Sequence, residues 1–147
     1  MRALYRVAGV FALGLLLAGC DNVDESIPTT PDPPTVTTSL TGGISVNGAE
    51  TKAFGVSAPG AVNATLTSVA FQVEEGAEPD PTPVTVGMAL GTISLGGNCT
   101  VVITNDNAVQ GTSLPGNVQG SGALCVRIYD TGKLTKPITY TVTVTHF

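Results

Sequence analysis

The chain has 147 residues, a formal net charge of −5 and only 12% charged residues. This length suits one ordinary domain with a short additional segment. Nucleic acid and anionic lipid headgroups repel an acidic chain, so the sign of the charge excludes a nucleic-acid-binding protein.

The first segment has the pattern of an export signal. Arg2 and Arg6 supply positive charge, and an uncharged apolar run from Val7 to Leu17 follows them. This run is too short to span a bilayer as a helix. The pattern predicts a signal peptide.

The residues Leu16-Leu17-Ala18-Gly19-Cys20 resemble the lipobox of bacterial lipoproteins. The resemblance implies a signal peptide over residues 1–19, cleavage before Cys20 and a diacylglyceryl lipid on the Cys20 thiol. It also implies attachment to a membrane of the bacterial cell envelope, with two or three acyl chains for stable anchoring. An ordinary secretory signal and an uncleaved anchor are the alternatives. Asp21 resembles the inner-membrane retention signal of enterobacterial lipoproteins, but the choice of inner or outer membrane stays open.

Residues 20–41 are predicted to be the lipidated N-terminus and a disordered linker. The linker's centre, residues 26–35, is rich in proline and threonine and has too few apolar side chains to bury. Proline favours extended polyproline II, which indicates a spacer, although a tail of no special purpose is the alternative. Removal of residues 1–19 leaves four basic and eleven acidic residues, a formal charge of −7.

Residues 42–147 are predicted to form a single β-sandwich domain. Apolar and polar residues alternate with the period of two that strands require, most clearly from Ile138 to Thr145. Asn47-Gly48 predicts a two-residue hairpin turn. The stretches 74–83 and 106–122 are expected to be irregular loops. The fold class is therefore all-β, a jelly-roll or immunoglobulin-like sandwich of about seven to eight strands.

Three segments carry a second resemblance: Ala58-Pro59-Gly60, residues 122–130 and residues 140–144. Their order is similar to that of the bacterial pre-peptidase C-terminal domain, over residues 50–147. The resemblance implies a small jelly-roll-like sandwich of the kind appended to secreted proteins. Residues 84–90 lack the acidic residues that this family often carries in its middle strand, so no metal role is expected.

The three cysteines fit an oxidising compartment. Because the lipid occupies Cys20, Cys99 and Cys125 remain as a pair, which favours a disulfide. A metal site or a reactive thiol is the alternative, and zinc is disfavoured because two thiols and the distant His146 are too few ligands for a tetrahedral site. Cys125 falls on the strand face opposite its apolar neighbours, so the pairing of the strands decides whether the bridge can form.

The sequence shows no catalytic motif and predicts no cofactor. His146 is the only histidine and is expected to be an inward-facing residue at a strand end. Neither a Gly-x-Ser-x-Gly elbow nor a phosphate-binding loop is present. The carboxylates of residues 74–80 are interpreted as solvated loop charges, with a calcium site as the alternative.

These observations predict a non-enzymatic cell-envelope lipoprotein. Its β-sandwich is expected to be a structural or protein-binding module, with an envelope protein as partner. The alternative is a small-ligand or carbohydrate-binding module. Sugar sites usually present aromatic side chains, and here Tyr129, beside Arg127 on one strand face, is the available candidate.

Overall fold

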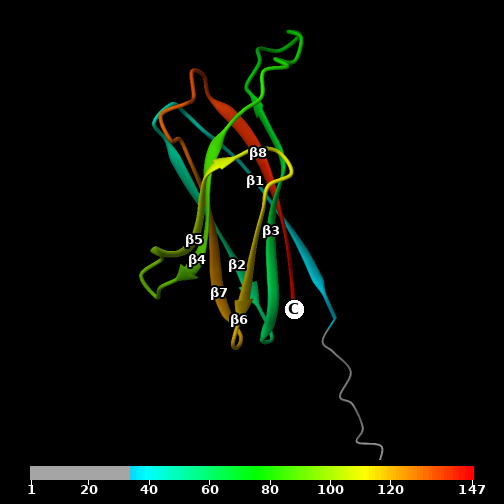
Figure 1. Cartoon of the computed structure of the whole chain (residues 1–147), viewed down its shortest axis with the longest axis vertical. Coiled ribbons are helices and arrows are strands. Elements are labelled where there is room, and N and C mark those ends of the chain that lie inside the picture. Colours follow the sequence, from blue (N-terminus) through cyan, green and yellow to red (C-terminus); the bar gives the residue numbers. More distant parts are fainter. Residues whose placement is uncertain (1–33) are drawn as a thin grey trace, which may run out of the picture. The chain divides into compact units, whose positions relative to one another are not determined.

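Valine- and threonine-rich segments with alternating polarity form eight β-strands (Figure 1). A computed structural model describes residues 34–147. The strands are β1 (Val36–Ile44), β2 (Ala49–Val56), β3 (Gly60–Phe71), β4 (Val86–Ile93), β5 (Cys99–Ala108), β6 (Ser113–Val118), β7 (Gly122–Tyr129) and β8 (Ile138–His146). The predicted all-β fold is confirmed.

The strands form two four-stranded antiparallel sheets, with the orders β1-β8-β3-β6 and β2-β7-β4-β5 (Figure 1). The pairs β1–β8, β2–β7, β3–β6 and β4–β5 join strands whose numbers add to nine. A chain that folds as one long hairpin and then wraps around a core produces this pairing. The sandwich is therefore a jelly roll, one of the two predicted alternatives.

The core lies between the sheets and is lined by the inward-facing side chains of both. In β8, Ile138, Tyr140, Val142 and Val144 are buried, while the threonines between them are at least partly exposed. Full burial of one large aliphatic side chain contributes roughly 1.5–3 kcal/mol. β4 is buried on both faces from Val86 to Gly91, so its outward-facing residues are also covered.

The sandwich begins earlier than predicted. β1 starts at Val36, whereas the predicted linker extended to residue 41. β1 pairs with β8 along its whole length, from Val36–His146 to Ile44–Ile138. β1 is an edge strand rich in threonine and glycine. Only Ile44 of β1 is buried in the core, with Leu40 packed against it, so the polarity of the segment does not reveal the strand.

The prediction that residues 106–122 form an irregular loop is also wrong in part, because this stretch contains β6. Pro115 and Gly116 are typical of turns and hide this strand in the sequence. Proline is tolerated here because β6 pairs only with β3 and forms the edge of its sheet. The second predicted loop, residues 74–83, contains no strand.

A turn does form at Asn47-Gly48, with Asn47 at a φ of 58°. It is not a hairpin turn, because β1 and β2 belong to different sheets. The chain passes from one layer of the sandwich to the other at this point. The prediction of a two-residue hairpin is therefore wrong, although the turn residues were identified correctly.

Residues 1–33 lie outside the described part of the chain. The signal peptide over 1–19, Cys20 and most of the linker therefore stay predictions. In residues 34–147, no helix has the length and apolar character needed to cross a membrane.

Candidate functional site

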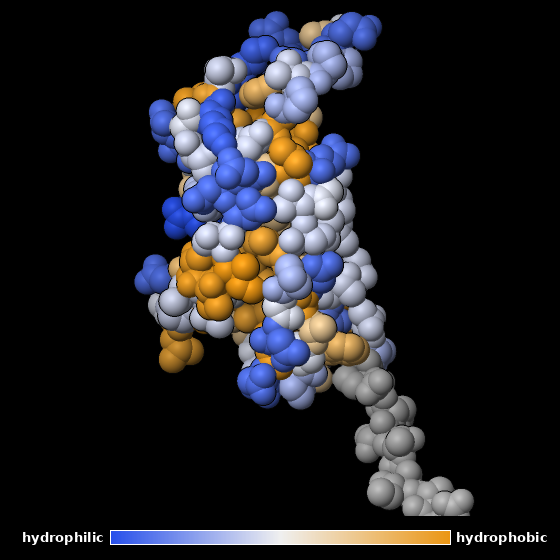
Figure 2. All heavy atoms as spheres, viewed as in Figure 1, coloured by the Kyte–Doolittle hydropathy of each residue, from blue (hydrophilic) through white to orange (hydrophobic). Residues whose placement is uncertain are grey.

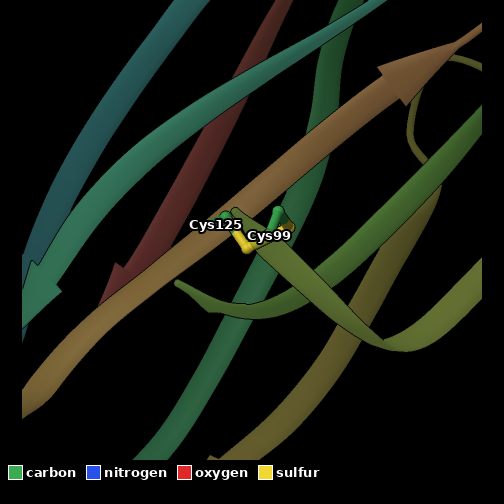
Figure 3. Close-up of a disulfide and its surroundings, with 2 residues drawn as sticks. All are labelled: Cys99 and Cys125. Carbon is green, nitrogen blue, oxygen red and sulfur yellow. A yellow bond between two sulfur atoms is a disulfide. The ribbon is translucent and has the colours of Figure 1, made fainter. Parts of the chain in front are cut away.

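The two predicted cysteines form a disulfide that joins β5 to β7 (Figure 3). The Cα atoms of Cys99 and Cys125 are 5.9 Å apart. β4 lies between these strands in the sheet, and each neighbouring pair of strands is separated by about 4.8 Å. In a flat sheet the two cysteines would be about twice that distance apart. The start of β5 must therefore cross the outer face of β4.

Gly91 makes this crossing possible. It pairs with Cys125 on one side and with Val101 on the other. A Cβ atom at Gly91 would lie 2.1 Å from the Thr100 carbonyl oxygen and 2.9 Å from the Val101 Cα. Both are backbone atoms, which cannot rotate away as the end of a side chain can. Only glycine fits beneath the crossing strand.

His146 is a core residue, as predicted from its register. It is 5% exposed, and its ring centroid lies 5.6 Å from that of Phe54. Nδ1 lies 3.1 Å from the Phe147 carbonyl oxygen, which can only accept, so Nδ1 donates. In the neutral ring Nε2 then accepts from the Thr38 hydroxyl at 3.2 Å. Both ring nitrogens are therefore hydrogen-bonded within the fold.

The carboxylates of the 74–83 loop do not converge on a cation site. Within residues 34–147, no group of three or more His, Cys, Asp or Glu side chains is placed to hold a metal ion. Asp80 instead pairs with Lys136, with 3.0 Å between Oδ2 and Nζ. Hydrogen bonds from the side chain and backbone of Thr82, followed by that from Lys136, lower the pKa of Asp80 to about 2.

Asp130 is a structural residue that the sequence reasoning missed. Its Oδ1 accepts the backbone N–H groups of Gly132, Lys133 and Leu134, and its Oδ2 accepts that of Asn47. Desolvation raises the pKa of Asp130, but the four N–H bonds together outweigh it, and the pKa is lowered. The ionised carboxylate ties the β7–β8 loop to the β1–β2 turn. An aspartate two residues before a glycine is a turn signal that could have identified it.

A second polar cluster, at Glu50, closes the sandwich where β2 approaches β1 and β8. Glu50 lies 2.6 Å from Lys52 Nζ and accepts the Tyr140 hydroxyl at 2.8 Å and the Gly43 N–H at 3.1 Å. The hydrogen bond from Lys52 is the main cause of the lowered pKa of Glu50. Burial, and then the hydrogen bond to Glu50, raise the pKa of Tyr140. The buried phenol therefore stays neutral and bonded.

An apolar hollow of 80 Å³ opens at the edge of the sandwich where β5 and β6 end the two sheets. Its lining comes from five strands and includes Val62, Leu90, Val102, Ile103, Val118 and Leu124. Val102 is 69% exposed. It is the extra residue of a bulge, because Leu90 pairs with Ile103 and Gly91 with Val101. Figure 2 shows hydrophobic residues gathered on this side of the molecule.

A second hollow, of 210 Å³, lies on the outer face of the β2-β7-β4-β5 sheet. Its lining residues are Ala89, Val101, Thr104, Arg127 and Tyr129. The outward positions of β4 between Gly87 and Gly91 carry no side chain larger than that of Ala89. The small residues of β4 therefore form the bottom of the hollow, and the larger side chains of β5 and β7 form its two sides. Tyr129 and Arg127, noted in the sequence as one strand face, are brought together here with Thr104.

No family model matches this chain, and no curated protein matches its sequence. In structure, the chain is similar to Aeromonas hydrophila PliG, described as a periplasmic lysozyme inhibitor of g-type lysozyme. The TM-score is 0.44 and the identity 11%, over 74% of this chain and 83% of that one. A likeness this weak leaves the function of this chain to be inferred from its own residues.

Proposed function

We propose that this chain is a lipid-anchored protein of the bacterial cell envelope whose jelly roll is a non-catalytic protein-binding module. The anchor is supported by the short apolar run that ends at Leu16–Cys20. A lipid on Cys20 would hold the domain at a membrane surface without a spanning helix. The membership of residues 50–147 in the pre-peptidase C-terminal domain family stays a prediction, and the jelly-roll topology supports it.

The observation that supports protein binding is the hollow at the β5–β6 edge. Its 80 Å³ suits one aliphatic side chain and is far below the roughly 300–1,000 Å³ of sites for drug-sized ligands. Protein interfaces gain much of their affinity where an apolar side chain fills such a pocket. Exposed Val102 adds apolar contact area beside the opening. We infer that a partner protein inserts one aliphatic side chain here.

The backbone of β5 is less suited to receive an added strand. Its pairing with β4 shifts register twice, between Val86 and Met88 and between Leu90 and Gly91. Such irregularities twist an edge and discourage further pairing. Contact through side chains at the hollow is therefore the better mode of binding.

Replacement Cys20→Ser should abolish membrane attachment, because serine has no thiol to accept the lipid. The variant should accumulate as an uncleaved precursor that contains residues 1–19. Intact-mass measurement and phase partitioning with a detergent would compare it with the parent. Identical mass and identical partitioning of the two proteins would contradict the lipoprotein assignment.

Replacement Val102→Glu should disrupt partner binding, because it places a charge at the opening of an apolar hollow. Val46→Glu is the matched control: Val46 is 41% exposed but lies in the β1–β2 turn. After crosslinking in the native host, we expect the yield of the captured partner to fall about tenfold for Val102→Glu and to stay unchanged for Val46→Glu. Equal yields from both variants, or no partner captured by the parent, would show that the hollow is not a protein-binding site.

A further inference from the structure

Tyr129 lies flat against the outer face of its sheet. Its neighbour on β4 is Gly87. A Cβ atom at Gly87 would lie 2.2 Å from Cε2, 2.3 Å from Cζ and 2.6 Å from Cδ2 of the tyrosine ring. Three adjacent ring atoms at similar distances mean that the glycine faces the plane of the ring, because an approach to the ring edge would leave two of them clearly farther away. Tyr129 is also partly exposed, so its opposite ring face is available to a ligand.

Polar contacts hold this ring in place. The Tyr129 hydroxyl donates a hydrogen bond to Asp106 on β5. That bond, followed by burial, raises the pKa of Tyr129, while the positive charge of Arg127 opposes the rise. Arg127 and Tyr129 stand two residues apart on β7 and line the same hollow. A fixed aromatic ring with a cation beside it is already in place on this face.

The charged groups around the hollow are balanced. Arg127 is exposed and takes part in neither of the two ion pairs found in residues 34–147, so its N–H donors are available. Asp106 is exposed and keeps acceptor positions beyond the one that Tyr129 uses, and the Thr104 hydroxyl both donates and accepts. One positive and one negative side chain on an acidic protein favour a neutral ligand that carries hydroxyl groups.

We propose that this hollow binds one ring of a neutral saccharide, stacked on Tyr129 and hydrogen-bonded to Arg127, Asp106 and Thr104. Its volume of 210 Å³ is below the roughly 300–1,000 Å³ typical of drug-sized ligands, which suits a single pyranose ring. The apolar C–H face of a pyranose complements the exposed face of the tyrosine, while its hydroxyls match both charged groups. This site is distinct from the hollow at the β5–β6 edge and does not depend on a protein partner.

The test is binding of the full chain, purified from membranes in detergent, to an array of neutral and acidic glycans. We expect binding to at least one neutral glycan, and a loss of about tenfold or more in affinity for Arg127→Ala and for Tyr129→Leu. Tyr129→Phe keeps the ring and should retain most of the binding. Thr51→Ala is the matched control, because Thr51 pairs with Arg127 from β2 and is exposed but does not line the hollow.

Circular dichroism would show whether each variant is folded. If Tyr129→Leu does not fold, Arg127→Ala decides the test, because it replaces an exposed side chain. Binding only to acidic glycans, binding to no glycan, or equal binding by Arg127→Ala and the parent would each overturn the proposal. A loss of binding in Thr51→Ala equal to that in Arg127→Ala would also overturn it, because the hollow would then not define the site.

Discussion

Replacement of both Cys99 and Cys125 by alanine is expected to lower the free energy of unfolding by about 3.5 kcal/mol. The bridge closes a loop across a sequence separation of 26 residues, and this figure is the unfolded-chain entropy that the loop-closure model assigns to it. A domain of this size has about 5–15 kcal/mol of net stability. The bridge would therefore supply a large share of the total.

Urea unfolding of the double variant and of the parent, each with and without a reducing agent, measures this difference. Reduction should destabilise the parent and leave the variant unchanged. Counting free thiols in the unfolded, unreduced parent gives a separate check. Two free thiols from residues 99 and 125, or equal stability of the two proteins, would show that the bridge does not form.

Replacement Gly91→Ala should destabilise the domain by at least about 3 kcal/mol, the upper end of the usual costs of overpacking. The added methyl group would lie 2.1 Å from the carbonyl oxygen of Thr100. β5 would have to lift away from β4, and its lifting would strain the bridge to Cys125. The expected readout is a lower urea midpoint.

Gly55→Ala is the matched control for this substitution. Gly55 lies in β2 of the same sheet, and a Cβ atom there would meet no atom within 4 Å. Alanine in an unhindered strand position should leave stability unchanged or raise it by about 0.5–1 kcal/mol, because glycine loses more backbone freedom on folding. Equal effects of the two substitutions would contradict the close crossing of β5 over Gly91.

Strands in which every second residue is apolar could be predicted from the sequence, whereas β1 and β6, which each place a single buried side chain in the core, could not. In β8, every second residue from Ile138 to Val144 is apolar because it must enter the core. β1 and β6 are the edge strands of their sheet, so each forms backbone hydrogen bonds with one neighbouring strand only. Residues such as proline and glycine are better tolerated there than in a central strand. Threonine and glycine in β1 and Pro115 in β6 therefore resemble a linker and a loop.

The candidate sites were predictable only in part. The disulfide follows from the count of cysteines, but its path over β4 depends on Gly91 and on a bulge, which are features of backbone geometry. The spacing of Arg127 and Tyr129 places them on one face, whereas Asp106 was assigned to a loop. The apolar hollow brings together Val62, Leu90 and Val118 from three different strands. Only the strand order of the two sheets makes them neighbours.

Pairing between strands whose numbers add to nine means that this domain closes from the middle of the chain outward. A short turn joins β4 to β5, whereas the contact between Thr38 and His146 spans 108 positions. Loop closure costs entropy that grows with the intervening chain, so β1 and β8 should pair last. If the proposed signal peptide directs export from the N-terminus, β1 would stay without its partner until β8 had also crossed the membrane. The arrival of β8 would then complete the sheet that begins with β1.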